Sequence, residues 1–173
     1  CHDDQAAGTL TAAARLHTHP VNIIPTQARV PDSLKEKGAR LGPDGAVICE
    51  TCHKPHDARP ATGLLVADNK QSPLCEDCHQ KQRQVAGGKH DMRLVKADSV
   101  NAREQTAAEG GACSACHLPH QGKGPKMWAR DPGSSRDAMA ALCLSCHEEG
   151  ALASKHQVGR YSHPVGVDVG RLG

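Results

Sequence analysis

Cys49-Glu50-Thr51-Cys52-His53 is the stretch that decides the fold, because its pattern of two cysteines and a histidine occurs four times along the chain. The other copies begin at Cys75, Cys113 and Cys143, and the four segments hold eight of the nine cysteines. The ninth, Cys1, is followed directly by His2, which we interpret as the second half of a fifth segment.

The spacing of this segment has a physical reason. Cysteines three positions apart lie on one face of a single turn, so both sulfurs reach the two vinyl groups of one haem, and the next residue lies under the iron. This is the attachment pattern of haem c, which we predict as the cofactor at four segments and, through Cys1 and His2, at a fifth. The predicted thioether residues are Cys1, Cys49, Cys52, Cys75, Cys78, Cys113, Cys116, Cys143 and Cys146. The predicted proximal iron ligands are His2, His53, His79, His117 and His147.

Zinc is the main rival for paired cysteines. Cys-x-x-Cys pairs about twenty residues apart are typical of zinc ribbons, and Cys52 and Cys75 have this separation. A zinc ribbon or a disulfide framework has no reason to place His after every second cysteine. A redox dithiol needs one such pair on a βαβ unit, which the sequence does not show. The four complete segments therefore favour haem.

The composition agrees with a large bound group. The chain has no Phe and only one Trp and one Tyr, Trp128 and Tyr161, so it lacks the side chains that fill most cores. A formal net charge of +2 does not suggest nucleic acid as a partner. No apolar stretch is long enough to span a bilayer as a helix.

A sequence repeat divides the chain. Cys49–His56 matches Cys113–His120, and Leu74–His79 matches Leu142–His147. A period above 60 residues fits a two-haem unit better than a solenoid. The predicted parts are the tail of a preceding unit and two two-haem units, at 1–48, 49–112 and 113–173.

The predicted fold class is mostly irregular and loop-rich, with a few short α-helices, little or no β-structure, and stacked haems as the core. Capping residues and glycines predict helices from Ser72 to about Val85, from Ser134 to about Gly150 and from Ser99 to about Glu109. Segments rich in Pro and Gly are predicted as loops at 18–48, 53–73, 118–134 and 157–173.

Twelve histidines are enough for two axial ligands on each of five haems. The distal ligands that we favour are His19, His56, His90, His120 and His163. His17 and His156 are the next choices, as distal or inter-subunit ligands. His56 and His120 follow a proximal ligand by three residues, too close to fold back onto the same iron, so we expect each to bind the neighbouring haem. The methionines do not recur in the repeat and are interpreted as packing residues.

The paired segments resemble those of multihaem c-type cytochromes with doubled Cys-x-x-Cys-His motifs. Further likeness lies in the Cys-x-x-Cys-His-x-Pro-His elements and in the His-Pro-Val elements at His19 and His163. The resemblance implies an extracellular, periplasmic or outer-membrane-associated electron carrier, whose partners are other redox proteins or extracellular electron acceptors. Some similar proteins form filaments in which a His of one subunit binds a haem of the next, which implies a homopolymer or a neighbouring cytochrome chain as a further partner.

Electron transfer without a substrate site is the function we expect, because the histidines are numerous enough to fill every iron. The propionates of five haems would move the net charge from +2 to about −8 and favour basic partners. The alternative is a nitrite- or hydroxylamine-type oxidoreductase with one open haem, although no Cys-x-x-Cys-Lys variant occurs. Cys1 has three interpretations: the start of a fragment, a single thioether, or the lipidated first residue of a lipoprotein with His2 incidental.

Overall fold

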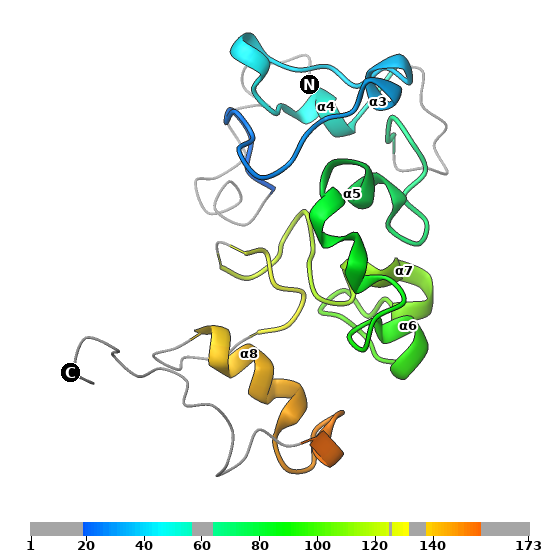
Figure 1. Cartoon of the computed structure of the whole chain (residues 1–173), viewed down its shortest axis with the longest axis vertical. Helices are drawn as coiled ribbons and strands as arrows, with labels where there is room; N and C mark the ends of the chain where they lie inside the picture. Colours follow the sequence, from blue (N-terminus) through cyan, green and yellow to red (C-terminus); the bar gives the residue numbers. More distant parts are fainter. Residues whose placement is uncertain (1–18, 57–63, 125, 132–137, 157–173) are drawn as a thin grey trace, which may run out of the picture. The chain divides into compact units, whose positions relative to one another are not determined.

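The structure is a computed structural model, which describes residues 19–56, 64–124, 126–131 and 138–156. Short helices joined by loops make up this part of the chain (Figure 1). The α-helices are α3 (Asp32–Glu36), α4 (Cys49–Cys52), α5 (Pro73–Cys78), α6 (Met92–Val95), α7 (Ala107–Ser114) and α8 (Ala138–His147). The 3-10 helices are η1 (Pro43–Gly45), η3 (Gln80–Val85) and η4 (Ser154–His156). Within these ranges β-structure is limited to isolated antiparallel bridges, so the predicted fold class is confirmed.

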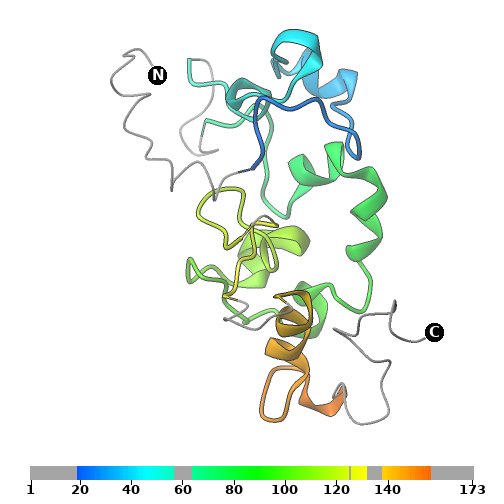
Figure 2. The same cartoon turned by 90° about the vertical axis from the view of Figure 1, so that its left-hand side faces the viewer.

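The chain divides into two compact units, Cys1–Ala129 and Arg130–Gly173. In the first, α6 and α7 lie side by side in both views (Figures 1 and 2). In the second, α8 packs against η4. The division into two-haem units stays a prediction, since it follows the motifs rather than the contacts. None of the described helices is long and apolar enough to cross a membrane.

The apolar core of the first unit is small. One cluster consists of Val30, Leu34, Ala39, Val66 and Leu74, and the other buried apolar residues that the structure describes there are Val47, Ala107, Ala112, Ala115, Leu118 and Ala129, none of them aromatic. The half-buried Cys78, an attachment cysteine, packs against this cluster. A core of so few aliphatic side chains is far below what a domain of this length normally buries.

The helix predicted from Ser72 to Val85 is only partly right. It begins at Pro73 as expected, but the α-helix ends at Cys78, because His79 leaves the helical conformation with φ −93° and ψ 56°. The chain then continues as the 3-10 helix η3, and the Arg83 Nε donates to the free carbonyl of Glu76 (2.9 Å). The break turns the backbone at the proposed iron ligand itself.

The helix predicted from Ser99 to Glu109 is wrong in its start and its end. Thr106 begins α7, because its hydroxyl accepts from the Glu109 N–H and the Glu109 carboxylate accepts from the Thr106 N–H. The Asn101 side chain holds the preceding residues as a turn by accepting from the N–H groups of Arg103 (2.9 Å) and Gln105 (3.2 Å).

Two other expectations need correction. α8 ends at His147 rather than near Gly150, and its predicted cap, Ser134-Ser135, lies outside the described residues. The segment 18–48, predicted as loop, contains the short helices α3 and η1.

Ser72 joins the start of α5 to α7. It is fully buried, and its hydroxyl donates to the Gly110 carbonyl (3.2 Å) and accepts from the Cys113 N–H (3.1 Å). Gly111, with φ +87°, makes this approach possible, since a Cβ there would lie 2.6 Å from the Ser72 hydroxyl oxygen. The segments that begin at Cys75 and Cys113 are therefore held together by the backbone.

Asp91 is a fully buried carboxylate beside His90, on the turn before α6. It pairs with Arg93 (2.5 Å between Nη2 and Oδ2) and accepts from the Gly87 N–H, while Arg93 also reaches Gln71. The hydrogen bonds from Arg93 lower the pKa of Asp91 from 3.8 to about 2. Because the folded-state pKa is the lower one, this network stabilises the fold above about pH 4 and loses that contribution as the pH falls toward 2.

Replacing Gly111 by alanine tests the junction at Ser72. We expect Gly111→Ala to lower the free energy of unfolding by about 2–5 kcal/mol, from left-handed strain and from the steric clash. Gly45→Ala is the matched control, because Gly45 has φ +81° but no atom within 4 Å of the added Cβ. It should cost only the strain, about 1–2 kcal/mol. Urea unfolding measures both losses, and equal losses would show that the close approach is absent.

Candidate metal centre

The attachment cysteines of the four complete segments are free thiols. The pairs in α4, α5 and α8 each lie within one helix, whereas in the third segment Cys113 lies in the last turn of α7, which ends at Ser114, and Cys116 follows the helix. In three of the segments the His N–H bonds the carbonyl of the first cysteine at 2.9 Å: His53, His79 and His117. Each segment therefore forms one helical turn that presents two sulfurs and then an imidazole, as haem attachment requires.

The thiols of the first three segments lie close to one another in the first unit. The Cys75 and Cys113 thiols are hydrogen-bonded, which raises the pKa of Cys75. Burial is the main cause of the raised pKa of Cys52 and of Cys78, the latter to about 11. These sulfurs thus point into a shared, poorly solvated interior, a suitable surrounding for apolar macrocycles.

Two pairs of imidazoles have the spacing of ligands on one iron. The ring centres of His53 and His120 are 5.9 Å apart, and those of His19 and His79 are 6.0 Å apart. Bonds from metals to imidazole nitrogens are about 2 Å long, so two imidazoles on opposite sides of one metal have centres roughly 6 Å apart. The His19 N–H donates to the carbonyl of Pro119 (2.7 Å), which places the two pairs next to each other.

Burial keeps members of both pairs in the form that binds metal. It is the main cause that lowers the pKa of His79 and of His120, and the neighbouring His19 and His53 add to the shift. A neutral imidazole has a free nitrogen lone pair, whereas the protonated ring has none.

The rings of His117 and His147 are oriented by backbone carbonyls. The His117 Nδ1 lies 2.8 Å from the carbonyl oxygen of Lys126, and the His147 Nδ1 lies 2.8 Å from that of His156. A carbonyl only accepts, so Nδ1 carries the proton in each case and the Nε2 lone pair is left for a metal. A histidine that binds a metal usually donates its other ring N–H to a carbonyl or carboxylate in this way.

The loops after the first and third segments share a backbone arrangement. The carbonyl of Cys52 accepts from Val66 N–H (2.9 Å), as that of Cys116 does from Ala129 N–H (2.8 Å). Antiparallel bridges join His53 to Leu65 and His117 to Trp128. The residues before these partners, Leu64 and Met127, both have positive φ, 60° and 54°. The eight-residue sequence repeat is thus accompanied by a shared structural feature, the partner residues 64–66 and 127–129.

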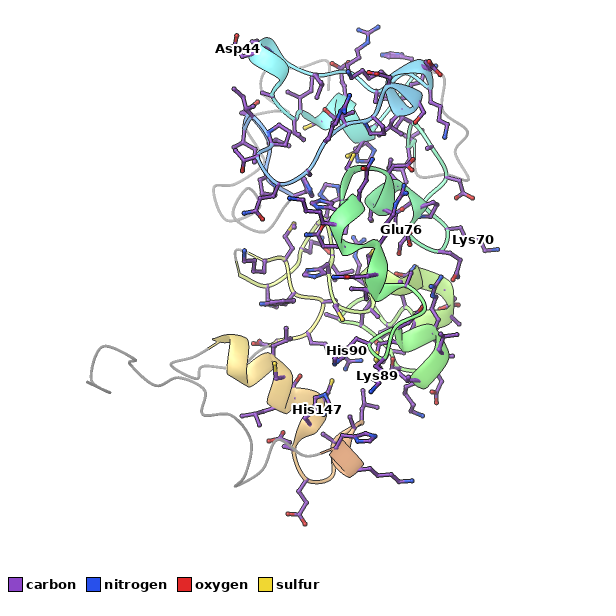
Figure 3. All side chains as sticks on the ribbon, in the orientation of Figure 1. Asp44, Lys70, Glu76, Lys89, His90 and His147 are labelled. Carbon is purple, nitrogen blue, oxygen red and sulfur yellow. The ribbon has the colours of Figure 1, made fainter. Side chains whose placement is uncertain are left out.

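The remaining candidate ligands do not lie together. His56 is exposed near the end of its segment, and His156 ends η4. His90 lies on the turn between η3 and α6 (Figure 3). The candidates outside the described residues are Cys1, His2, His17 and His163. Over the described ranges no group of three or more His, Cys, Asp or Glu gathers as a zinc ribbon would need.

Sequence reasoning missed the contact of Trp128, whose indole stacks on the His117 imidazole with ring centres 4.8 Å apart. It also missed the carbonyls that orient His117 and His147. Each accepting carbonyl comes nine residues after its histidine, and backbone groups leave no signal in side-chain patterns.

The comparisons with known proteins give one match. The family described as the doubled CXXCH motif matches residues 43–84 and 106–152, more than half of the chain. No curated protein and no solved structure matches. The thiol pairs, the neutral imidazoles and their spacing fit covalent haem. The chain therefore belongs to the doubled CXXCH motif family of multihaem c-type cytochromes, which bind haem c covalently and carry electrons.

Proposed function

We propose that this chain conducts electrons through a row of four to five bis-histidine haems, as part of an exported multihaem conduit. Each haem, once attached, supplies an iron that takes up and releases one electron. The polypeptide holds these irons at fixed positions, fills both of their axial sites and keeps water from them. The observation that carries the proposal is the spacing of the two histidine pairs.

The two pairs support a proposed set of iron ligands for the first two segments. His53 and His120 bind the iron of the haem on Cys49 and Cys52, and His79 and His19 bind that of the haem on Cys75 and Cys78. His117 and His147 bind the next two irons through Nε2, since their Nδ1 atoms are engaged.

The same assignment brings the haems close to one another. His117 and His120 are three residues apart and bind different irons, so the haems of the first and third segments are neighbours. The contact between the Cys75 and Cys113 thiols brings the haems of the second and third segments together. Electrons thus have a continuous path within the first unit.

The distal ligands of the other haems come from His56, His90, His156, His163 and His17. Cys1 and His2 would hold a fifth haem. The haem propionates make the surface acidic, which suits basic redox proteins or cation-rich extracellular acceptors. The location that we propose is extracellular or periplasmic, supported by the family's likeness to exported carriers.

Exchange of His120 tests the ligand assignment. We expect His120→Ala to convert one haem, that on Cys49 and Cys52, from low-spin to high-spin iron in the EPR spectrum of the oxidised protein. His120→Met should keep that iron low-spin and raise its reduction potential, because thioether ligands favour the reduced state. Gln121→Ala, an exposed neighbour, is the control and should change neither property. A His120→Ala protein with every haem still low-spin would contradict the assignment.

Assembly into filaments is a further part of the proposal, and electron microscopy of the native protein tests it. We expect filaments with a regular subunit repeat, in which a histidine of one subunit binds a haem of the next. Discrete particles at every concentration tested would contradict the filament while leaving the electron carrier intact.

A further inference from the structure

The His117 imidazole is held at both its edge and its face by one loop. At the edge, Nδ1 lies 2.8 Å from the Lys126 carbonyl oxygen. On the face, the Trp128 indole stacks at 4.8 Å between ring centres, with 24° between the planes. Both partners belong to residues 118–129, which we term the return loop.

Trp128 itself is fixed by the backbone of the return loop. It exchanges hydrogen bonds with Lys123 in both directions, at 2.8 Å and 2.9 Å. The loop has no room to relax there, because a Cβ at Gly122 would lie 2.5 Å from the Met127 backbone. The backbone that carries the indole is therefore held in place beside the His117 ring.

The plane of an axial imidazole and the hydrogen bond at its Nδ1 both affect the iron. A strong Nδ1–H···O bond makes Nε2 more basic, which favours the oxidised iron and lowers the reduction potential. The plane determines which iron d orbitals interact with the ring, and this sets the spread of the EPR g values. An aromatic ring stacked flat against the imidazole keeps both its plane and the hydrogen bond at its Nδ1 constant.

We propose that Trp128 is a positioning residue that fixes the plane and the hydrogen bond of the His117 imidazole. It thereby sets the reduction potential and the EPR signal of the haem on Cys113 and Cys116. This inference rests on the proposed function, in which His117 binds that iron.

The first half of the chain offers a natural comparison. Leu65 occupies the bridge position opposite His53 that Trp128 occupies opposite His117. A leucine cannot form a flat stack, so the haem on Cys49 and Cys52 lacks this constraint. Trp128→Leu therefore places opposite His117 the same side chain, leucine, that lies opposite His53.

The test compares the holoprotein with Trp128→Leu and Trp128→Phe by EPR and potentiometric titration. In Trp128→Leu one EPR signal should change its g values. One midpoint potential should also rise, with the ratio of reduced to oxidised iron increasing by about tenfold, or about 59 mV for a one-electron couple. Trp128→Phe keeps a flat ring and should restore both properties, and the other haems should not change in either variant.

Several results would overturn the inference. Trp128→Leu spectra and potentials identical to those of the wild type would mean that the stack has no effect on the iron. A shift of all haems together, or a Trp128→Phe protein that behaves like Trp128→Leu, would mean that Trp128 acts on the fold as a whole. Failure of the proposed function is distinguishable, since the wild-type protein itself would then lack low-spin bis-histidine signals.

Discussion

Covalent attachment of haem c through Cys-x-x-Cys-His segments is the constraint on which the rest of the structure depends. A chain without Phe and with a small aliphatic cluster around Leu34 cannot bury enough apolar area to offset its conformational entropy. Each segment adds three bonds to a rigid apolar group, which restricts the unfolded chain as cross-links do. This explains why α4 and α5 are short, because each needs only the turn that presents two sulfurs and then an imidazole.

Hydrogen bonds to backbone groups hold the attachment segments next to one another. Ser72 ties the second segment to the third, and the bond from His19 to Pro119 ties the two histidine pairs to each other. Antiparallel bridges pair His53 with Leu65 and His117 with Trp128. Few of these contacts need a large side chain, which explains how a Gly- and Pro-rich sequence holds metal ligands in place.

The sequence predicted the chemistry better than the local structure. The attachment segments, the loop-rich fold class and the family were predictable, because covalent chemistry requires a strict pattern of residue types. The start of α7 was missed although Thr106 and Glu109 form a recognisable capping box. The sequence indicated His19 and His120 as candidate ligands but not which proximal histidine each one faces. That pairing depends on contacts between segments far apart in the chain. The stack of Trp128 on His117 depends on the shape of the return loop. The stretch that follows the first segment has almost none of the same residues, so the sequence repeat gave no indication of the stack.

Folding of the chain without haem tests the central claim most directly. The protein is to be produced with all attachment cysteines replaced by serine, and its circular dichroism and hydrogen exchange compared with those of the haem-loaded protein. The account predicts weak helical signal, rapid exchange and no cooperative unfolding transition without haem, and a cooperative transition with it. A haem-free chain that unfolds cooperatively, with native protection of α5 and α7, would contradict the claim that the haems are the core.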